Sequence, residues 1–70
     1  MQIMNIHKVI EVLAYSNDSW EDAAKQAVAD ASKSLKHIES LYINDMSAKV
    51  ENNKITQYRI NAKITFKVEG

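Results

Sequence analysis

The chain of 70 residues contains no cysteine and no proline, and it has a single glycine. Without cysteine it can form neither a disulfide nor a thiolate metal site, and its two isolated histidines do not have the spacing of zinc ligands. A single core in so short a chain rarely supplies more than about 3–5 kcal/mol, so small domains usually need a further stabilising device. Oligomerisation is the device that remains.

The chain also lacks a net charge, because nine Lys and Arg residues balance nine Asp and Glu residues. It therefore has no electrostatic field to attract nucleic acid or an anionic membrane. Its uninterrupted apolar runs are only a few residues long, and Met1–Asn5 lacks the charged and apolar regions of a signal peptide. We expect a soluble, cytoplasmic protein with neither nucleic acid nor membrane as a partner.

Motifs that carry catalysis are absent as well. The sequence has no cysteine nucleophile, no glycine-rich phosphate loop, no nucleophile elbow, and no carboxylate pair in a context that argues for acid–base chemistry. We therefore expect a protein that is not an enzyme.

The sequence does contain a long amphipathic strand near its end. From Lys54 to Val68, apolar and polar residues alternate without a glycine or proline, which is the period of a half-buried strand. At the usual rise this strand would reach about 50 Å, whereas a compact globule of this length measures about 30 Å across. Part of its apolar face must be covered from outside the chain, and a second copy is the simplest supplier.

Two further strands and one helix precede it. The alternation predicts strands over Ile6–Tyr15 and Leu41–Val50, and a tight turn over Glu51–Lys54, where asparagines tolerate left-handed backbone. We predict one domain over residues 1–70 with an α+β fold in the order β-α-β-β. The longest strand would be central in an antiparallel sheet of order 1-3-2, wrapped around the helix, and the protomer would assemble with further copies of itself.

The helix is expected to begin after an N-cap at Asp18 or Ser19. Apolar residues recur at helical spacing from Trp20 as far as Ile38, and most of them are alanines, which would let the helix approach the sheet closely. Trp20 is expected to be a packing anchor. We expect the exposed end of the third strand, near Phe66, to lie between subunits.

Several short motifs in this order resemble the dodecin family, and the resemblance spans nearly the whole chain. The resembling pieces are His7–Val12, Ser19–Ala24, Tyr58–Ile60 and Phe66–Val68. The resemblance implies a non-catalytic protein that stores or sequesters flavin in a hollow shell of twelve subunits. It thus implies a homododecamer with flavin (riboflavin, FMN or FAD) as the bound cofactor.

Two positions of the family's flavin site differ here. A tryptophan that stacks on the flavin ring corresponds to Ser40, and a glutamine that hydrogen-bonds the ring edge corresponds to Arg59. Aromatic stacking is worth about 1–3 kcal/mol for a base on an aromatic side chain, and serine cannot replace it. We predict a ligand pocket at Ser40, Tyr42 and Arg59, with Tyr42, Tyr58 or Trp20 taking over the stacking if flavin is bound.

A second hypothesis keeps the shell and changes its ligand. The helix start Ser19–Glu21 resembles a branch of the family described as binding calcium, and calcium prefers hard oxygen ligands. Asp18, Glu21 and Asp22 are the candidate metal ligands. An anionic metabolite is the other candidate, because Arg59, Lys63 and Lys67 form a cationic row on one strand face. A purely structural assembly is the third hypothesis.

Overall fold

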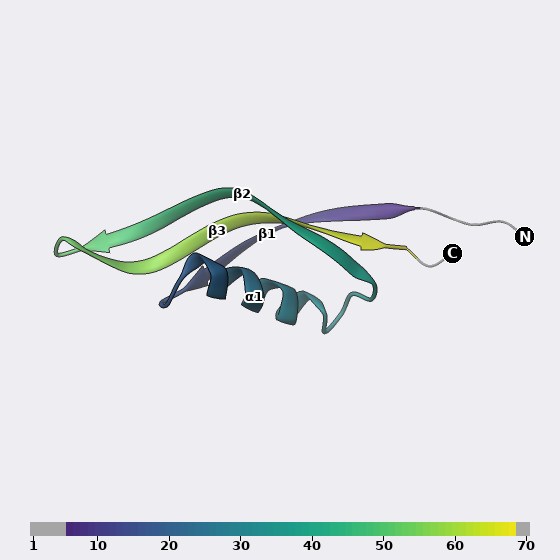
Figure 1. Ribbon diagram of the computed structural model, residues 1–70, viewed down its shortest axis with the longest axis horizontal. Coiled ribbons are helices and arrows are strands. Elements are labelled where there is room, and N and C mark those ends of the chain that lie inside the picture. Colours follow the sequence, from purple (N-terminus) through teal and green to yellow (C-terminus); the bar gives the residue numbers. More distant parts are fainter. Residues whose placement is uncertain (1–5, 69–70) are drawn as a thin grey trace, which may run out of the picture.

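A computed structural model of the chain describes residues 6–68; Met1–Asn5 and Glu69–Gly70 lie outside the described residues. The sheet has the order β1-β3-β2, and both strand pairs are antiparallel. A single described helix lies against one face of this sheet (Figure 1). The elements are β1 (His7–Ser16), α1 (Trp20–Ala31), β2 (Ile38–Glu51) and β3 (Lys54–Lys67). The predicted α+β fold, element order and sheet order are confirmed.

Helix α1 begins as predicted but ends earlier. Ser19 is the N-cap, and its hydroxyl accepts a hydrogen bond from the Asp22 amide at 2.9 Å. The helix ends at Ala31, because the following amides of Lys33 and Ser34 bond to carbonyls only three residues back, at 3.2 and 3.1 Å. Hydrogen bonds to the third residue back are typical of the last turn of a helix. The Ser32 hydroxyl also donates to the Ala29 carbonyl and so competes with the helical backbone bonds. The prediction that the helical stripe continues to Ile38 is wrong.

The chain reverses at His37, whose φ of 60° lies in the left-handed region, and Ile38 then begins β2. The His37 carbonyl accepts a hydrogen bond from the Lys67 amide at 3.0 Å, which fixes the reversal against the end of β3. Leu35, which the helical pattern had included, instead lines a small cavity together with Phe66. None of the described residues forms a helix long and apolar enough to cross a membrane.

The core lies between α1 and the centre of the sheet. Ala23, Ala62 and Ile64 are fully buried and Ile60 is nearly so, while side chains such as Val12 and Leu41 pack around them only partly buried. The alanines allow the helix to sit close to the strands, as the sequence predicts. A core of this size is small even for a short chain, so the protomer has little to stabilise it alone.

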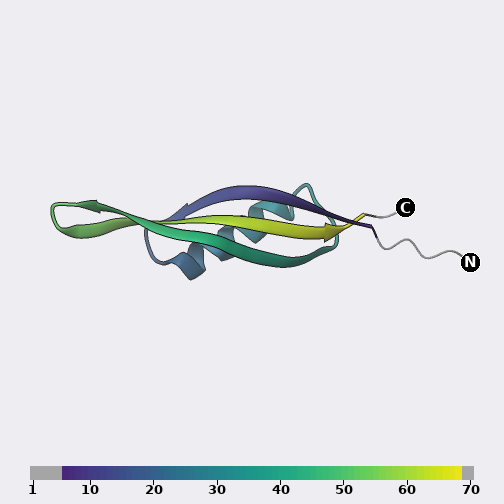
Figure 2. The ribbon, with the colours of Figure 1, turned by 90° about the horizontal axis from the view of Figure 1, so that it is seen from above.

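The molecule is elongated because β2 and β3 run past the helix (Figure 1 and Figure 2). Its radius of gyration is 14.8 Å, whereas a compact chain of this length would have about 11 Å. β1 stops where Ser16 pairs with Tyr58, so residues 49–57 form a two-stranded hairpin with neither β1 nor α1 beside it. We call this segment the hairpin arm.

The hairpin arm is the overhang that the long strand predicts. Its position differs from the expected one near Phe66, because Phe66 pairs with Lys8 and Ile38 of its own chain and is partly buried there. The turn at the tip is as predicted, since Asn52 and Asn53 have φ values of 51° and 65°. Asparagine adopts this conformation more readily than other residues with a side chain.

Candidate functional site

The sheet face away from α1, here called the outer face, carries exposed apolar side chains. Strand alternation places the odd-numbered residues of β3 from Gln57 to Lys67 on this face, since Ile60, Ala62 and Ile64 point to the core. Four large apolar side chains of β1 and β2 that pair with these residues are 53–67% exposed: Val9, Leu13, Tyr15 and Tyr42. Monomeric proteins rarely leave such a surface uncovered.

A pocket of about 210 Å³ lies on the outer face where β1, β3 and β2 pass side by side. Register explains its composition, because Arg59 of β3 pairs with Tyr15 of β1 on one side and with Ser47 of β2 on the other. Leu13 and Asp45 border it one step along the sheet, where both pair with Asn61. The pocket thus combines one cation, one carboxylate, an amide and an aromatic ring.

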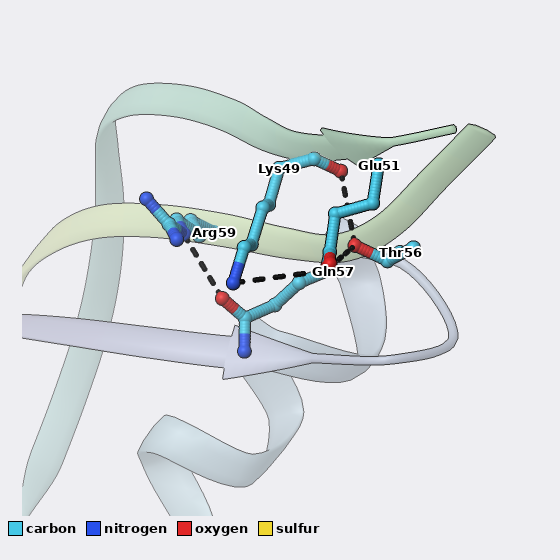
Figure 3. Close-up of polar contacts among 5 residues, drawn as sticks. All are labelled: Lys49, Glu51, Thr56, Gln57 and Arg59. Carbon is cyan, nitrogen blue, oxygen red and sulfur yellow. Dashed lines mark hydrogen bonds and ion pairs between the residues drawn. The ribbon is translucent and has the colours of Figure 1, made fainter. Parts of the chain in front are cut away.

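Arg59 is held from two sides within this pocket. Its Cζ lies 5.9 Å from the centroid of the Tyr15 ring, and its Nε donates a hydrogen bond to Gln57 Oε1 at 3.0 Å (Figure 3). Among residues 6–68 no carboxylate forms an ion pair with it. The guanidinium is therefore oriented, and its terminal N–H groups are available to an acceptor from outside the chain.

Asn61 supplies a hydrogen-bond acceptor to the pocket, whereas Arg59 supplies donors. Its side-chain Oδ1 is buried, and no donor within the described part of the chain bonds to it. Leaving a buried acceptor unsatisfied costs about 1–3 kcal/mol, so such atoms in native proteins call for an explanation. A donor on a ligand or on a neighbouring subunit would satisfy it.

The three predicted pocket residues share the outer face but are spread along it. Ser40 pairs with Thr65 and Tyr42 pairs with Lys63, so the backbone distance from Ser40 to Arg59 is about 20 Å along the sheet. One chain therefore does not bring Ser40 and Arg59 into one pocket. Tyr15 and Asn61 are pocket residues that the sequence does not single out: only the strand register places Tyr15 beside Arg59, and only the packing shows that Asn61 Oδ1 is buried without a donor among the described residues.

Two of the aromatic residues considered for stacking lie on the other side of the sheet. Trp20 meets Tyr58 edge to face with ring centroids 4.8 Å apart, and its Nε1 donates to the Ser47 carbonyl at 2.9 Å. Both rings pack where α1 begins, so Trp20 is the packing anchor that its position in the sequence predicts. Tyr15 and Tyr42 are left as the exposed rings of the outer face.

The predicted metal ligands lie at the start of α1, where the carboxylates of Asp22 and Glu21 already make contacts within the chain. Asp22 accepts hydrogen bonds from the Ser16 hydroxyl at 2.6 Å and from the Gln26 amide, while Glu21 pairs with Lys25 at 3.2 Å. The Asp18 amide bonds to the Ser16 hydroxyl at 2.9 Å. Within residues 6–68 no three acidic or histidine side chains are arranged to hold a metal ion.

The same hydrogen bonds explain the acidity of Asp22. The bond from Ser16, followed by the bond from Gln26, lowers the pKa of its carboxyl group, because both favour the charged form. Lys25 contributes in the same direction. The negatively charged Asp22 carboxylate thus links the end of β1 to the first turn of α1 through its hydrogen bonds.

The fold is a small unit in which a three-stranded sheet wraps one helix and leaves large apolar side chains exposed on its outer face. Comparison with known proteins identifies the family: the Dodecin family model matches residues 6–69. This chain belongs to the dodecin family, as its resemblance predicts.

Two of the relatives are calcium dodecins. The calcium dodecin of Mycobacterium tuberculosis is 32% identical over 65 residues, which cover 93% of this chain and 92% of the relative. The crystal structure of a calcium dodecin from that organism, described as calcium chelating, matches with a TM-score of 0.78 and 34% identity over 91% of each chain.

Two other solved structures share the fold. The dodecin of Streptomyces coelicolor has a TM-score of 0.89 at 23% identity, with 94% of each chain covered. A protein of Thermus thermophilus has a TM-score of 0.90 at 21% identity, with 96% of this chain and 98% of that chain covered.

Proposed function

We propose that this protein is a non-catalytic, homo-oligomeric binding protein of the dodecin type that takes up flavin on its outer face. The observation that carries the ligand assignment is the buried, unsatisfied Asn61 Oδ1 beside the oriented guanidinium of Arg59. The cytoplasmic location expected from the sequence and the count of twelve subunits implied by the resemblance are part of this proposal.

Flavin chemistry fits these two groups. The pyrimidine edge of the isoalloxazine ring presents a carbonyl, an N–H and a second carbonyl in a row. Arg59 would donate to a carbonyl and Asn61 Oδ1 would accept from the N–H, so both protein groups would be satisfied. Tyr15, which is 53% exposed beside Arg59, offers an aromatic face for the ring system.

The pocket of one chain is too small for this ligand by itself. Its volume of about 210 Å³ is below the roughly 300 Å³ at which ligand pockets usually begin. A neighbouring copy would supply the remaining wall, and Ser40 and Tyr42, which lie farther along the same face, would reach the ligand from that copy. The predicted pocket residues would then belong to one site shared between subunits.

A titration of riboflavin and FMN, followed by quenching of flavin fluorescence, tests the assignment. Arg59→Ala should weaken binding about tenfold, the effect of one lost hydrogen bond of about 1.4 kcal/mol, and Tyr15→Leu should reduce the quenching. Lys67→Ala is the matched control, because it removes a cation from the same face about 26 Å farther along β3. No quenching with the unmodified protein would contradict the flavin assignment.

Calcium is the second candidate, because a calcium dodecin is 32% identical to this chain over 93% of its length. Asp18, Glu21 and Asp22 stay the proposed ligands, and a neighbouring subunit would have to complete their coordination, since one chain engages Asp22 and Glu21 in internal contacts. Isothermal titration with calcium chloride tests this. A saturable heat signal that is lost in the Asp22→Asn variant would support calcium binding. A flat titration of the unmodified protein would contradict it.

A further inference from the structure

The hairpin arm has two chemically different faces. Lys49, Glu51, Thr56 and Gln57 gather on one side, where Lys49 pairs with Glu51 at 3.7 Å and Thr56 bonds to Glu51 at 3.2 Å (Figure 3). Val50 lies between Lys49 and Glu51 in β2, so alternation directs it to the opposite side, together with its partner Ile55. That side is the one that faces α1 elsewhere in the sheet.

Among residues 6–68, the apolar side of the arm is left largely uncovered. Val50 is 61% exposed and Ile55 49% exposed, and Met46, nearer the body on the same side, is 55% exposed. Trp20 at the start of α1 reaches only as far as Tyr58 and the Ser47 carbonyl. A two-stranded hairpin without a packed face is marginally stable in water, so this side requires a partner surface.

A groove of matching character lies on the body of the molecule, on the α1 side of the sheet. It is bounded by α1 and β2, has a volume of about 410 Å³, and is lined by Ala24, Val28, Ala29 and Leu41, with Lys25 as the one charged residue. The groove between α1 and β1 is a poorer match, because Gln26, Asp30 and Lys33 line it. The outer face is also mixed, with Arg59 and Asp45 among its apolar residues.

We propose that the apolar side of the hairpin arm docks into the groove between α1 and β2 of a second copy of this chain. The inference rests on the proposed homo-oligomer and specifies one of its contacts. Arm and groove are different surfaces, so each copy gives one and receives one, and such a heterologous contact closes into a ring when the rotation between copies allows it. The polar side of the arm then faces solvent or the interior of the assembly.

Engineered cysteines test this contact directly, because the natural chain has none. A double variant with Val50→Cys on the arm and Lys25→Cys at the groove rim is treated with a short bis-maleimide and run on a denaturing gel. The contact predicts a ladder of linked dimers, trimers and longer chains. Val50→Cys alone should give at most a trace of dimer.

Two matched variants separate this contact from random collisions. Thr56→Cys with Lys25→Cys moves the thiol to the polar side of the arm, and Val50→Cys with Gln26→Cys moves it to the other groove; both should give at least fivefold less linked product. Equal yields from all three pairs, or strong dimers from Val50→Cys alone, would overturn the arm-to-groove contact.

Light scattering on the same samples keeps the two proposals distinguishable. An oligomer without the ladder would overturn only the arm-to-groove contact and leave the proposed homo-oligomer standing. A monomeric mass for the unmodified protein would overturn both.

Discussion

At the scale of single residues, a hydrogen bond between Ser16 and Asp22 joins the end of β1 to the start of α1. Ser16 is 5% exposed, and its hydroxyl donates to Asp22 and accepts from the amides of Asp18 and Ser19. It thereby satisfies amides that a helix start leaves without partners. The sequence predicts the cap at Ser19, but the bridge from Ser16 to Asp22 depends on where β1 ends, which the alternation pattern places one residue too early.

The lowered pKa of Asp22 gives a pH prediction. A carboxyl whose pKa is lower in the folded state stabilises the fold above its unfolded pKa of about 4, and this contribution is lost as the pH falls through the folded value. Ser16→Ala removes the first cause, so the pKa of Asp22, followed by NMR titration of its side-chain carbonyl, should rise toward the ordinary range. An unchanged titration would show that Ser16 is not the cause.

The stability of the fold at low pH should depend on the protonation of the Asp22 carboxyl group. Asp22→Asn should make urea unfolding less sensitive to acidification from pH 7 to pH 3, at fixed protein concentration. Asp30→Asn is the control, because Asp30 is an exposed carboxylate in an exposed ion pair with Lys33, and exposed pairs contribute little. Equal acid sensitivity of the Asp22→Asn variant and the unmodified protein would contradict the role of Asp22.

Position 40 offers a gain-of-function prediction. Ser40 lies on the outer face where the family resemblance places a stacking tryptophan, and it is exposed opposite Thr65. Ser40→Trp should tighten riboflavin binding at least tenfold, since stacking on an aromatic side chain is worth about 1–3 kcal/mol. Fluorescence quenching measures this, with Ser40→Leu as a control of similar hydrophobic character and no aromatic face. Equal effects of both substitutions would contradict a stacking role.

At the scale of elements, the strands were predictable except for the start of β2, which lies at Ile38 and not at the predicted Leu41. The helix end was not predictable. Alternation from Lys54 onward identifies β3 almost to the residue, because no helical spacing of apolar residues competes with the period of two. The helical stripe continues by coincidence through Leu35 and Ile38, and the stop at Ala31 depends on tight backbone bonds and on the left-handed His37. No glycine or proline marks that stop in the sequence.

The turn of the hairpin arm is the element whose residues can be tested most directly. Asn52 and Asn53 both have positive φ, which costs other residues with a side chain about 1–2 kcal/mol. Asn53→Val should therefore lower the free energy of unfolding by about that amount, whereas Asn53→Gly should not lower it. Urea unfolding at fixed protein concentration measures both, and equal stabilities of the two variants would contradict this account of the turn.

At the scale of the whole molecule, the sequence predicts that the protomer is incomplete, but not which surfaces are open. The length of β3 against the expected size of the globule indicates an overhang, and the structure places it at the hairpin end. The candidate ligand pocket depends on the pairing of Arg59 with Tyr15 across two strands. Such a register is set by long-range pairing, which residue spacing in one strand does not reveal.

The central claim is that this chain is a protomer completed by its own copies. The mass of the purified protein in solution, measured by light scattering after size exclusion, tests it most directly. The chain has a mass of 8.0 kDa, so twelve copies, the number that the family resemblance implies, would give about 96 kDa (12 × 8.0). A particle of that mass is the predicted result. A single species of 8 kDa that unfolds cooperatively would contradict the account.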